Sequence, residues 1–120
     1  MSYNSPPLGQ EISCVMKEIP KNYLFKNKKL KSLIENSLKK NNFTILKSIY
    51  HNFSPQGFTA LILLSESHLA VHTYPEYNSI SFNMYSCRGK NDAEPIFNLI
   101  KKELKPKEIL FYKKNKIPVN

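Results

Sequence analysis

The sequence has few of the features that mark a secreted, membrane-spanning or zinc-binding protein. Its two cysteines, Cys14 and Cys87, are too few for a disulfide framework, and neither lies in a CxxC pair of the kind that holds structural zinc. The longest apolar run, Ala60 to Leu64, has the length of a strand and is much shorter than a membrane span. Residues 1–9 are polar and lack the basic and apolar parts of a signal peptide. We therefore expect a cytoplasmic protein with no membrane partner.

Arginine is nearly absent from a chain that is otherwise strongly basic. The formal net charge is +9, yet Arg88 is the only arginine, and the lysines are spread from Lys17 to Lys116. Proteins that read nucleic-acid bases favour arginine, whereas scattered lysines usually form solvated helix faces. We expect no nucleic-acid partner, and a non-enzymatic basic binding module remains an alternative that only the charge supports.

The hydrophobic pattern predicts a single domain over residues 1–120. Two amphipathic helices are expected, one over 28–40 and one that begins with Asp92 as its N-cap and ends at Pro106. The expected strands are 10–16, 43–53, 58–64, 68–74, 79–87 and 108–112, with loose ends at 1–7 and 113–120. This order predicts an α+β two-layer sandwich, in which an antiparallel sheet carries both helices on one face.

Polar side chains gather at the junction of two strands that are otherwise apolar: Glu66, Ser67, His68 and His72. Such a break in the local pattern tends to mark function or strain. A serine near a histidine could be a nucleophile with its base, although the chain has no G-x-S-x-G elbow. His68 and His72 share one face of a strand and could hold a metal with a carboxylate, although no third ligand is evident. The pattern alone leaves both chemistries open.

The same segment resembles a known signature. Glu66-Ser67-His68 followed by His72-Thr73-Tyr74-Pro75-Glu76 is similar to the E-S-H-x-x-x-H-T-W-P-E motif of the small prokaryotic S-adenosylmethionine decarboxylase proenzymes. The similarity continues in register on both sides, through His51-Asn52-Phe53, Pro55-Gln56-Gly57 and Tyr85-Ser86-Cys87, and covers about residues 8 to 112. A lone E-S-H would be a weak signal, but this ordered set is specific.

The resemblance implies a chain that cuts itself between Glu66 and Ser67 and is built as 1–66 (β chain) and 67–120 (α chain). Ser67 would become a pyruvoyl group, with Thr59 and His72 assisting the processing step. This group would form a Schiff base with the substrate amine and accept electrons during loss of carbon dioxide, so neither pyridoxal phosphate nor a metal is expected. Cys87 aligns with the proton donor of the family.

The resemblance also implies S-adenosylmethionine as the substrate, a role in polyamine synthesis, and a homodimer with active sites near its interface. Phe53 and Leu69 would pack on the adenine, and Glu76 would bind the ribose hydroxyls. Four positions depart from the family pattern: Glu11 stands where histidine is common, Tyr74 replaces tryptophan, Thr59 replaces serine, and Arg88 precedes a glycine that usually follows the cysteine directly. Because relatives of this family act on arginine or ornithine, these two substrates remain alternatives.

Overall fold

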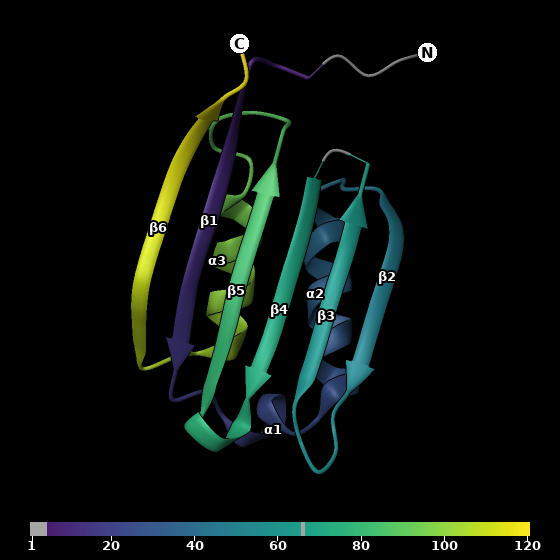
Figure 1. Ribbon diagram of the computed structural model, residues 1–120, viewed down its shortest axis with the longest axis vertical. Helices are drawn as coiled ribbons and strands as arrows, with labels where there is room; N and C mark the ends of the chain where they lie inside the picture. The colour runs from purple at the N-terminus through teal and green to yellow at the C-terminus, as the bar shows by residue number, and fades with distance from the viewer. Residues whose placement is uncertain (1–4, 66) are drawn as a thin grey trace.

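A single antiparallel sheet backed by helices forms the protein. The computed structural model describes residues 5–65 and 67–120, so Glu66 lies outside the described residues. The six strands are ordered β2-β3-β4-β5-β1-β6 in the sheet. Their bounds are β1 (Leu8–Lys17), β2 (Ile45–Asn52), β3 (Phe58–Leu64), β4 (Ser67–Tyr74), β5 (Ser79–Ser86) and β6 (Glu108–Pro118). Figure 1 shows α2 (Asn27–Lys40) and α3 (Glu94–Leu104) behind the sheet, with its other face uncovered. The predicted α+β two-layer sandwich is confirmed.

The period of two along the strands divides the sheet into a helix side and an open side. In β3 the buried residues are Phe58, Ala60, Ile62 and Leu64, which face the helices. The residues between them point to the open side, where Leu61 is 43% and Leu63 is 53% exposed. On α2 and α3 the apolar positions recur at helical spacing and close the core from the other layer. The open side of β3 is therefore more apolar than a solvated sheet face usually is.

The helices are short. The longest, α2, has 14 residues and ends at Lys40, where the predicted helix also ends. Two short segments were not predicted, the helix α1 (Lys21–Leu24) and the 3-10 turn η1 (Pro75–Tyr77). Within residues 5–65 and 67–120, no helix is long and apolar enough to span a membrane.

The start of α3 differs from the prediction. Ala93, not Asp92, is the N-cap residue, and it offers no side-chain cap. The cap comes from β1 instead, because the Oε1 atom of Gln10 accepts the backbone N–H groups of Ala93 at 2.8 Å and Glu94 at 3.1 Å. This leaves the carboxylate of Asp92 available for other partners.

The predicted loose tail from residue 113 is also wrong. Strand β6 runs to Pro118 and pairs with β1 along its length, from Leu8 opposite Pro118 to Lys17 opposite Glu108. The prediction failed because residues 113–118 are rich in lysine, which is depleted in strands on average. An edge strand exposes such side chains to solvent, where the charges also discourage pairing with another sheet.

Candidate functional site

Ser67 begins β4, directly after the turn that joins it to β3. Its backbone pairs with Leu64 on β3 and with Ser86 on β5. Directly opposite residues in a sheet share a face, and both partners are buried, so the Ser67 side chain points to the helix side. Its Oγ atom is buried and has no hydrogen-bond partner among the described residues. A buried hydroxyl without a partner is costly, and such atoms are concentrated at functional positions.

Cys87 follows immediately after Ser86, the strand partner of Ser67. This places the predicted cleavage residue and the predicted proton donor at the same end of the sheet. The Cys87 thiol is partly exposed and accepts a hydrogen bond from Ser5 Oγ at 3.3 Å. Cys14, by contrast, is buried in the core, where burial raises the pKa of its thiol to about 11 against a smaller lowering by Lys101. Of the two thiols, Cys87 has the position and the exposure for proton transfer.

Thr59 and His72 form the second element of the predicted site. They lie directly opposite each other on β3 and β4, and both point to the open side of the sheet. The Thr59 hydroxyl and the His72 Nδ1 atom are joined by a hydrogen bond of 3.0 Å, whose direction depends on the histidine tautomer. This bond fixes the imidazole ring, and Nε2 is then the ring nitrogen available for a substrate or a scissile peptide.

A cavity of about 320 Å³ surrounds this pair, and four predicted residues line it together: Phe53, Thr59, His72 and Glu76. Phe53 is half exposed at the end of β2, where its N–H donates to the carbonyl of Gly57 at 2.9 Å. Gly57 has a φ of +111°, a conformation that side chains rarely adopt, and it lies against the Phe53 ring. Glu76 reaches the cavity from η1. An aromatic face and a carboxylate on one cavity suit a ligand that has both a flat ring and hydroxyl groups.

These two groups of residues do not meet within one chain. Ser67 and His72 are separated by five positions of β4, which corresponds to about 17 Å along an extended strand. They also point to opposite sides of the sheet. The predicted site is therefore divided into a Ser67 end, which includes Ser86 and Cys87, and a His72 end, which includes Thr59, Phe53 and Glu76.

The structure gives less support to two further predicted residues. Leu69 is 1% exposed and belongs to the hydrophobic core, so its packing against substrate stays a prediction. His68 is exposed on the open side, with its ring 5.9 Å from that of Tyr85. Within residues 5–65 and 67–120 there is no cluster of three or more His, Cys, Asp or Glu that could hold an ion.

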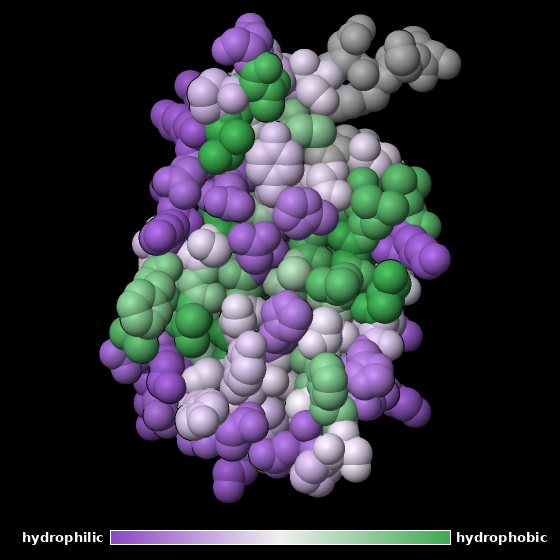
Figure 2. Space-filling model, viewed as in Figure 1, coloured by the Kyte–Doolittle hydropathy of each residue, from purple (hydrophilic) through white to green (hydrophobic). Residues whose placement is uncertain are grey.

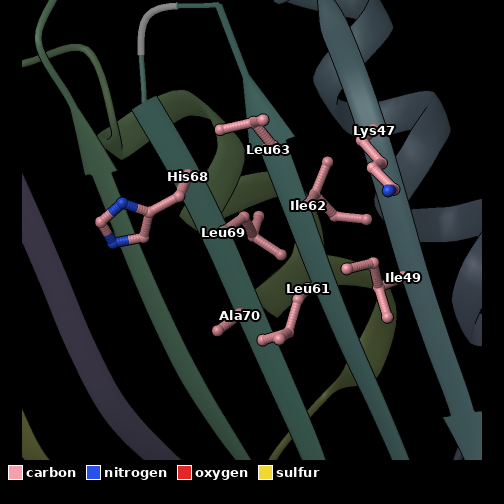
Figure 3. A pocket seen from close by; sticks show the side chains of 8 residues that line it. All are labelled: Lys47, Ile49, Leu61, Ile62, Leu63, His68, Leu69 and Ala70. Atoms are coloured by element: carbon pink, nitrogen blue, oxygen red, sulfur yellow. The ribbon is translucent and has the colours of Figure 1, made fainter.

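An apolar patch lies on the open side between the two ends. Ile49, Leu61 and Leu63 are between 43% and 53% exposed there, and they line a shallow cavity of about 290 Å³. Figure 2 shows these apolar surfaces gathered over β2, β3 and β4. Figure 3 shows the three side chains extending from β2 and β3, with His68 turned toward β5. Contiguous exposed apolar surface of this kind is typical of a protein–protein contact.

Sequence reasoning missed a polar network next to Ser86. Arg88 and Asp92 form an ion pair with an Nε–Oδ2 distance of 2.7 Å, and the Ser86 hydroxyl donates to the same Oδ2 atom at 2.5 Å. Two signals could have indicated it. Arg88 is the only arginine of the chain, and Ser86 is a hydroxyl residue at a position whose strand periodicity points into the core.

The family model for S-adenosylmethionine decarboxylase matches residues 10–115. The chain belongs to this family. A relative from Sulfurihydrogenibium sp. (strain YO3AOP1), called an S-adenosylmethionine decarboxylase proenzyme, is 39% identical over 93 residues, which are 76% of this chain and 70% of the relative. A relative of the same name from Archaeoglobus fulgidus is 28% identical over 105 residues, or 88% of this chain and 94% of the relative.

A solved structure extends the similarity to the fold. The crystal structure of the adenosylmethionine decarboxylase from Aquifex aeolicus superposes with a TM-score of 0.81 at 27% identity, and the match covers 93% of this chain and 90% of that one. The family predicted from the motif around Ser67 is thus confirmed.

Proposed function

We propose that this chain is a self-processing, pyruvoyl-dependent decarboxylase of S-adenosylmethionine. The observation that carries the proposal is the state of Ser67 in a chain of this family. Its buried hydroxyl has no hydrogen-bond partner among the residues that the structure describes, and its strand partner Ser86 directly precedes Cys87. Neither the family match nor the geometry favours arginine or ornithine as substrate, or an unprocessed basic module. A cytoplasmic location and a role in polyamine synthesis remain predictions.

Self-processing needs only atoms that the chain and water supply. The Ser67 hydroxyl oxygen attacks the carbonyl carbon of residue 66, the peptide C–N bond breaks, and the hydroxyl proton passes to the departing nitrogen. A base then removes the α-proton of residue 67 while its Cβ–Oγ bond breaks, which releases a new carboxylate at residue 66. Water replaces the nitrogen of the resulting dehydroalanine, ammonia leaves, and residue 67 becomes a pyruvoyl group. No oxidant or reductant is required.

Thr59 and His72 have the chemistry for the proton transfers in this sequence. A hydroxyl can polarise the carbonyl under attack, and a neutral imidazole can take up the α-proton near neutral pH. Their hydrogen bond of 3.0 Å holds both groups in a fixed relation. The same cavity contains Phe53, which we expect to stack on the adenine, and Glu76, which we expect to accept hydrogen bonds from the ribose hydroxyls.

The residues at the Ser67 end fit the group that processing would create. The hydroxyl oxygen of Ser67 is buried, and a partly exposed thiol lies nearby. Ser67 is also the first residue of its strand, where a new chain terminus can form without breaking the sheet. When present, a pyruvoyl group supplies a carbonyl that withdraws electrons from the substrate as carbon dioxide is lost. Cys87 would then return a proton to the substrate carbon.

Two copies of the chain are needed to complete such a site. Since Ser67 and His72 are about 17 Å apart on β4, the Ser67 end of one copy must meet the His72 end of another. A two-fold axis over the middle of β4, near Ala70, would make both encounters at once and give two equivalent sites. The apolar patch of Ile49, Leu61 and Leu63 lies on the open side of the sheet, the same side as Ala70, and supplies the apolar surface that a dimer contact needs.

Intact mass spectrometry tests the processing step. We expect the wild-type protein to give two fragments, residues 1–66 and a 67–120 fragment with a blocked start. Ser67→Ala should give one uncut chain, because the attacking oxygen is missing. Ser65→Ala, a change at the neighbouring turn serine, is the matched control and should still be cut. A wild-type chain that stays uncut after prolonged incubation contradicts the proposal.

The cut protein then decides the substrate. Release of carbon dioxide should occur with S-adenosylmethionine and not with arginine or ornithine. Turnover of either amino acid alone would keep the chemistry and replace the substrate.

A further inference from the structure

Two serines face each other at the predicted cleavage site. Ser67 and Ser86 are directly opposite on β4 and β5 and point to the helix side, with Ser86 fully buried. The Cβ atoms of such a pair are about 5 Å apart, and opposed hydroxyl residues commonly hydrogen-bond across strands. Here they do not, because the Ser67 Oγ atom has no partner in the described part of the chain.

The Ser86 hydroxyl is occupied elsewhere. It donates to Asp92 Oδ2 at 2.5 Å and accepts the backbone N–H of Arg88 at 3.2 Å. A serine hydroxyl has a single proton, so the bond to Asp92 prevents Ser86 from donating to Ser67. A bond to a carboxylate is also stronger than one to a neutral hydroxyl, so Ser86 prefers Asp92.

Asp92 is itself held in place by the only arginine. Arg88 binds both carboxylate oxygens of Asp92, with Nε to Oδ2 at 2.7 Å and Nη2 to Oδ1 at 3.2 Å. Its other donors reach the carbonyl oxygens of Asn41 at 2.9 Å and Asn42 at 3.0 Å, at the end of α2. The guanidinium group lies 3.6 Å from the centre of the Phe43 ring. A forked ion pair with this many contacts fixes the carboxylate more firmly than a surface pair would.

We propose that Asp92 and Arg88 are positioning residues that hold the Ser86 hydroxyl away from Ser67 and so keep the Ser67 hydroxyl available for self-cleavage. The inference rests on the proposed function. If Ser86 were released, it could donate to Ser67 Oγ. That bond would occupy one of the two lone pairs of the attacking oxygen and make the oxygen less nucleophilic toward the carbonyl carbon of residue 66. The chemical step itself is unchanged, with one C–O bond formed, one C–N bond broken and one proton moved from oxygen to nitrogen.

The test is the rate of self-cleavage, followed by intact mass from the moment of cell-free synthesis. We expect Asp92→Ala to slow cleavage about tenfold, the factor that corresponds to breaking one additional hydrogen bond before attack. The double change Asp92→Ala with Ser86→Ala should bring the rate back to within about threefold of wild type, because the competing hydroxyl is gone. A merely structural role of Asp92 predicts no such recovery. Glu94→Ala, on the same helix end and without a bond to Ser86, is the matched control and should cleave normally.

Each outcome supports or overturns the inference. Asp92→Ala that cleaves at the wild-type rate, or a double variant as slow as the single one, overturns it while leaving self-processing intact. An uncut wild-type chain overturns the proposed function, and this inference with it. If Asp92→Ala fails to fold, as judged by its thermal transition, Arg88→Gln with and without Ser86→Ala takes its place. Without the two hydrogen bonds from Arg88, the Asp92 carboxylate is no longer held in position against the Ser86 hydroxyl. A slow Arg88→Gln that Ser86→Ala does not restore then counts against the inference.

Discussion

The two ends of β4 are built in opposite ways. The Ser67 hydroxyl points into the protein, and next to it Ser86, Arg88 and Asp92 form a polar network that also contacts the end of α2. The His72 end lies on the open side of the sheet and lines a cavity of about 320 Å³. Thr59 and His72 come from β3 and β4, Phe53 follows the end of β2, and Glu76 belongs to the turn η1. The first end is enclosed and surrounded by polar contacts, and the second is open and suited to a ligand.

This difference bears on why the active site would need two chains. A strand can bring together residues that are opposite or two positions apart, but not residues five positions apart on different sides. A chain of 120 residues with one sheet cannot fold back on itself to close that gap. Association through the open side would bring the His72 end of one copy against the backbone at the start of β4 in the other, while the Ser67 hydroxyl itself points to the helix side.

The largest expected effect is complementation between two inactive variants. Ser67→Ala and His72→Ala should each remain uncut when produced alone, because one lacks the nucleophile and the other the base. Produced together, they should form mixed dimers in which Ser67 of the His72→Ala chain meets His72 of the Ser67→Ala chain. With a different tag on each chain, mass spectrometry should find that only the His72→Ala chain is cut.

The control for this experiment replaces the Ser67→Ala chain with one that carries both changes, which should remove all cleavage. Mixed dimers that form but stay uncut would contradict a site shared between chains. Cleavage of His72→Ala alone would instead contradict the role of His72.

A smaller effect is expected at the other end of β4, from Cys87→Ser. Processing should continue, since the thiol is not the attacking group, but decarboxylation should fall about 10²-fold or more because a hydroxyl is a much weaker acid. The measurement is kcat for carbon dioxide release from fully cut protein. Cys14→Ser, at the buried thiol, is the control and should change stability more than kcat.

Most of the fold was accessible from the sequence because its strands alternate and its helices are amphipathic. The predicted strand 58–64 agrees with β3 at both ends, since turn residues flank it. The errors arose where tertiary contacts override local preference. Gln10 caps α3 from a distant strand, and pairing with β1 turns a lysine-rich tail into β6.

Less of the site than of the fold could be predicted from the sequence. The motif around Ser67 identified the family, but one sequence does not reveal that Thr59 and His72 lie on the far side of the sheet from the Ser67 hydroxyl. Only the register of β3, β4 and β5 shows this separation. The role of Arg88 was hidden for the same reason, because its partners come from the end of α2 and the start of α3.

A third prediction compares the two sides of β3 through adjacent residues. Ile62 is 1% exposed on the helix side, and Ile62→Ala should lower the free energy of unfolding by about 2–5 kcal/mol through the cavity that it leaves. Leu63 is 53% exposed on the open side, and Leu63→Ala should leave the folded chain intact but weaken the dimer. Thermal unfolding and analytical ultracentrifugation over a range of concentrations separate the two effects. A monomeric wild type, or a Leu63→Ala dimer as tight as wild type, would argue against the open side as the contact.

The smallest effect concerns an ion pair near the Ser67 end. Glu94 at the start of α3 binds Lys114 of β6 at 3.0 Å. The hydrogen bond from Lys114, together with one from Gln10, holds the pKa of Glu94 below its ordinary value. A lowered carboxylate pKa means that the pair stabilises the fold above the ordinary carboxyl pKa and that this contribution is lost as the pH falls through the lowered pKa.

Lys114→Met should therefore lower Tm by about one or two degrees at pH 7, since exposed pairs contribute little, and the difference should shrink toward zero in acid. Calorimetry at pH 7 and pH 3 measures it. Lys116→Met, on the same strand and outside the two ion pairs found among the described residues, controls for the lost charge. A Tm difference that persists at pH 3 would mean that Lys114 acts through its packing and not through Glu94.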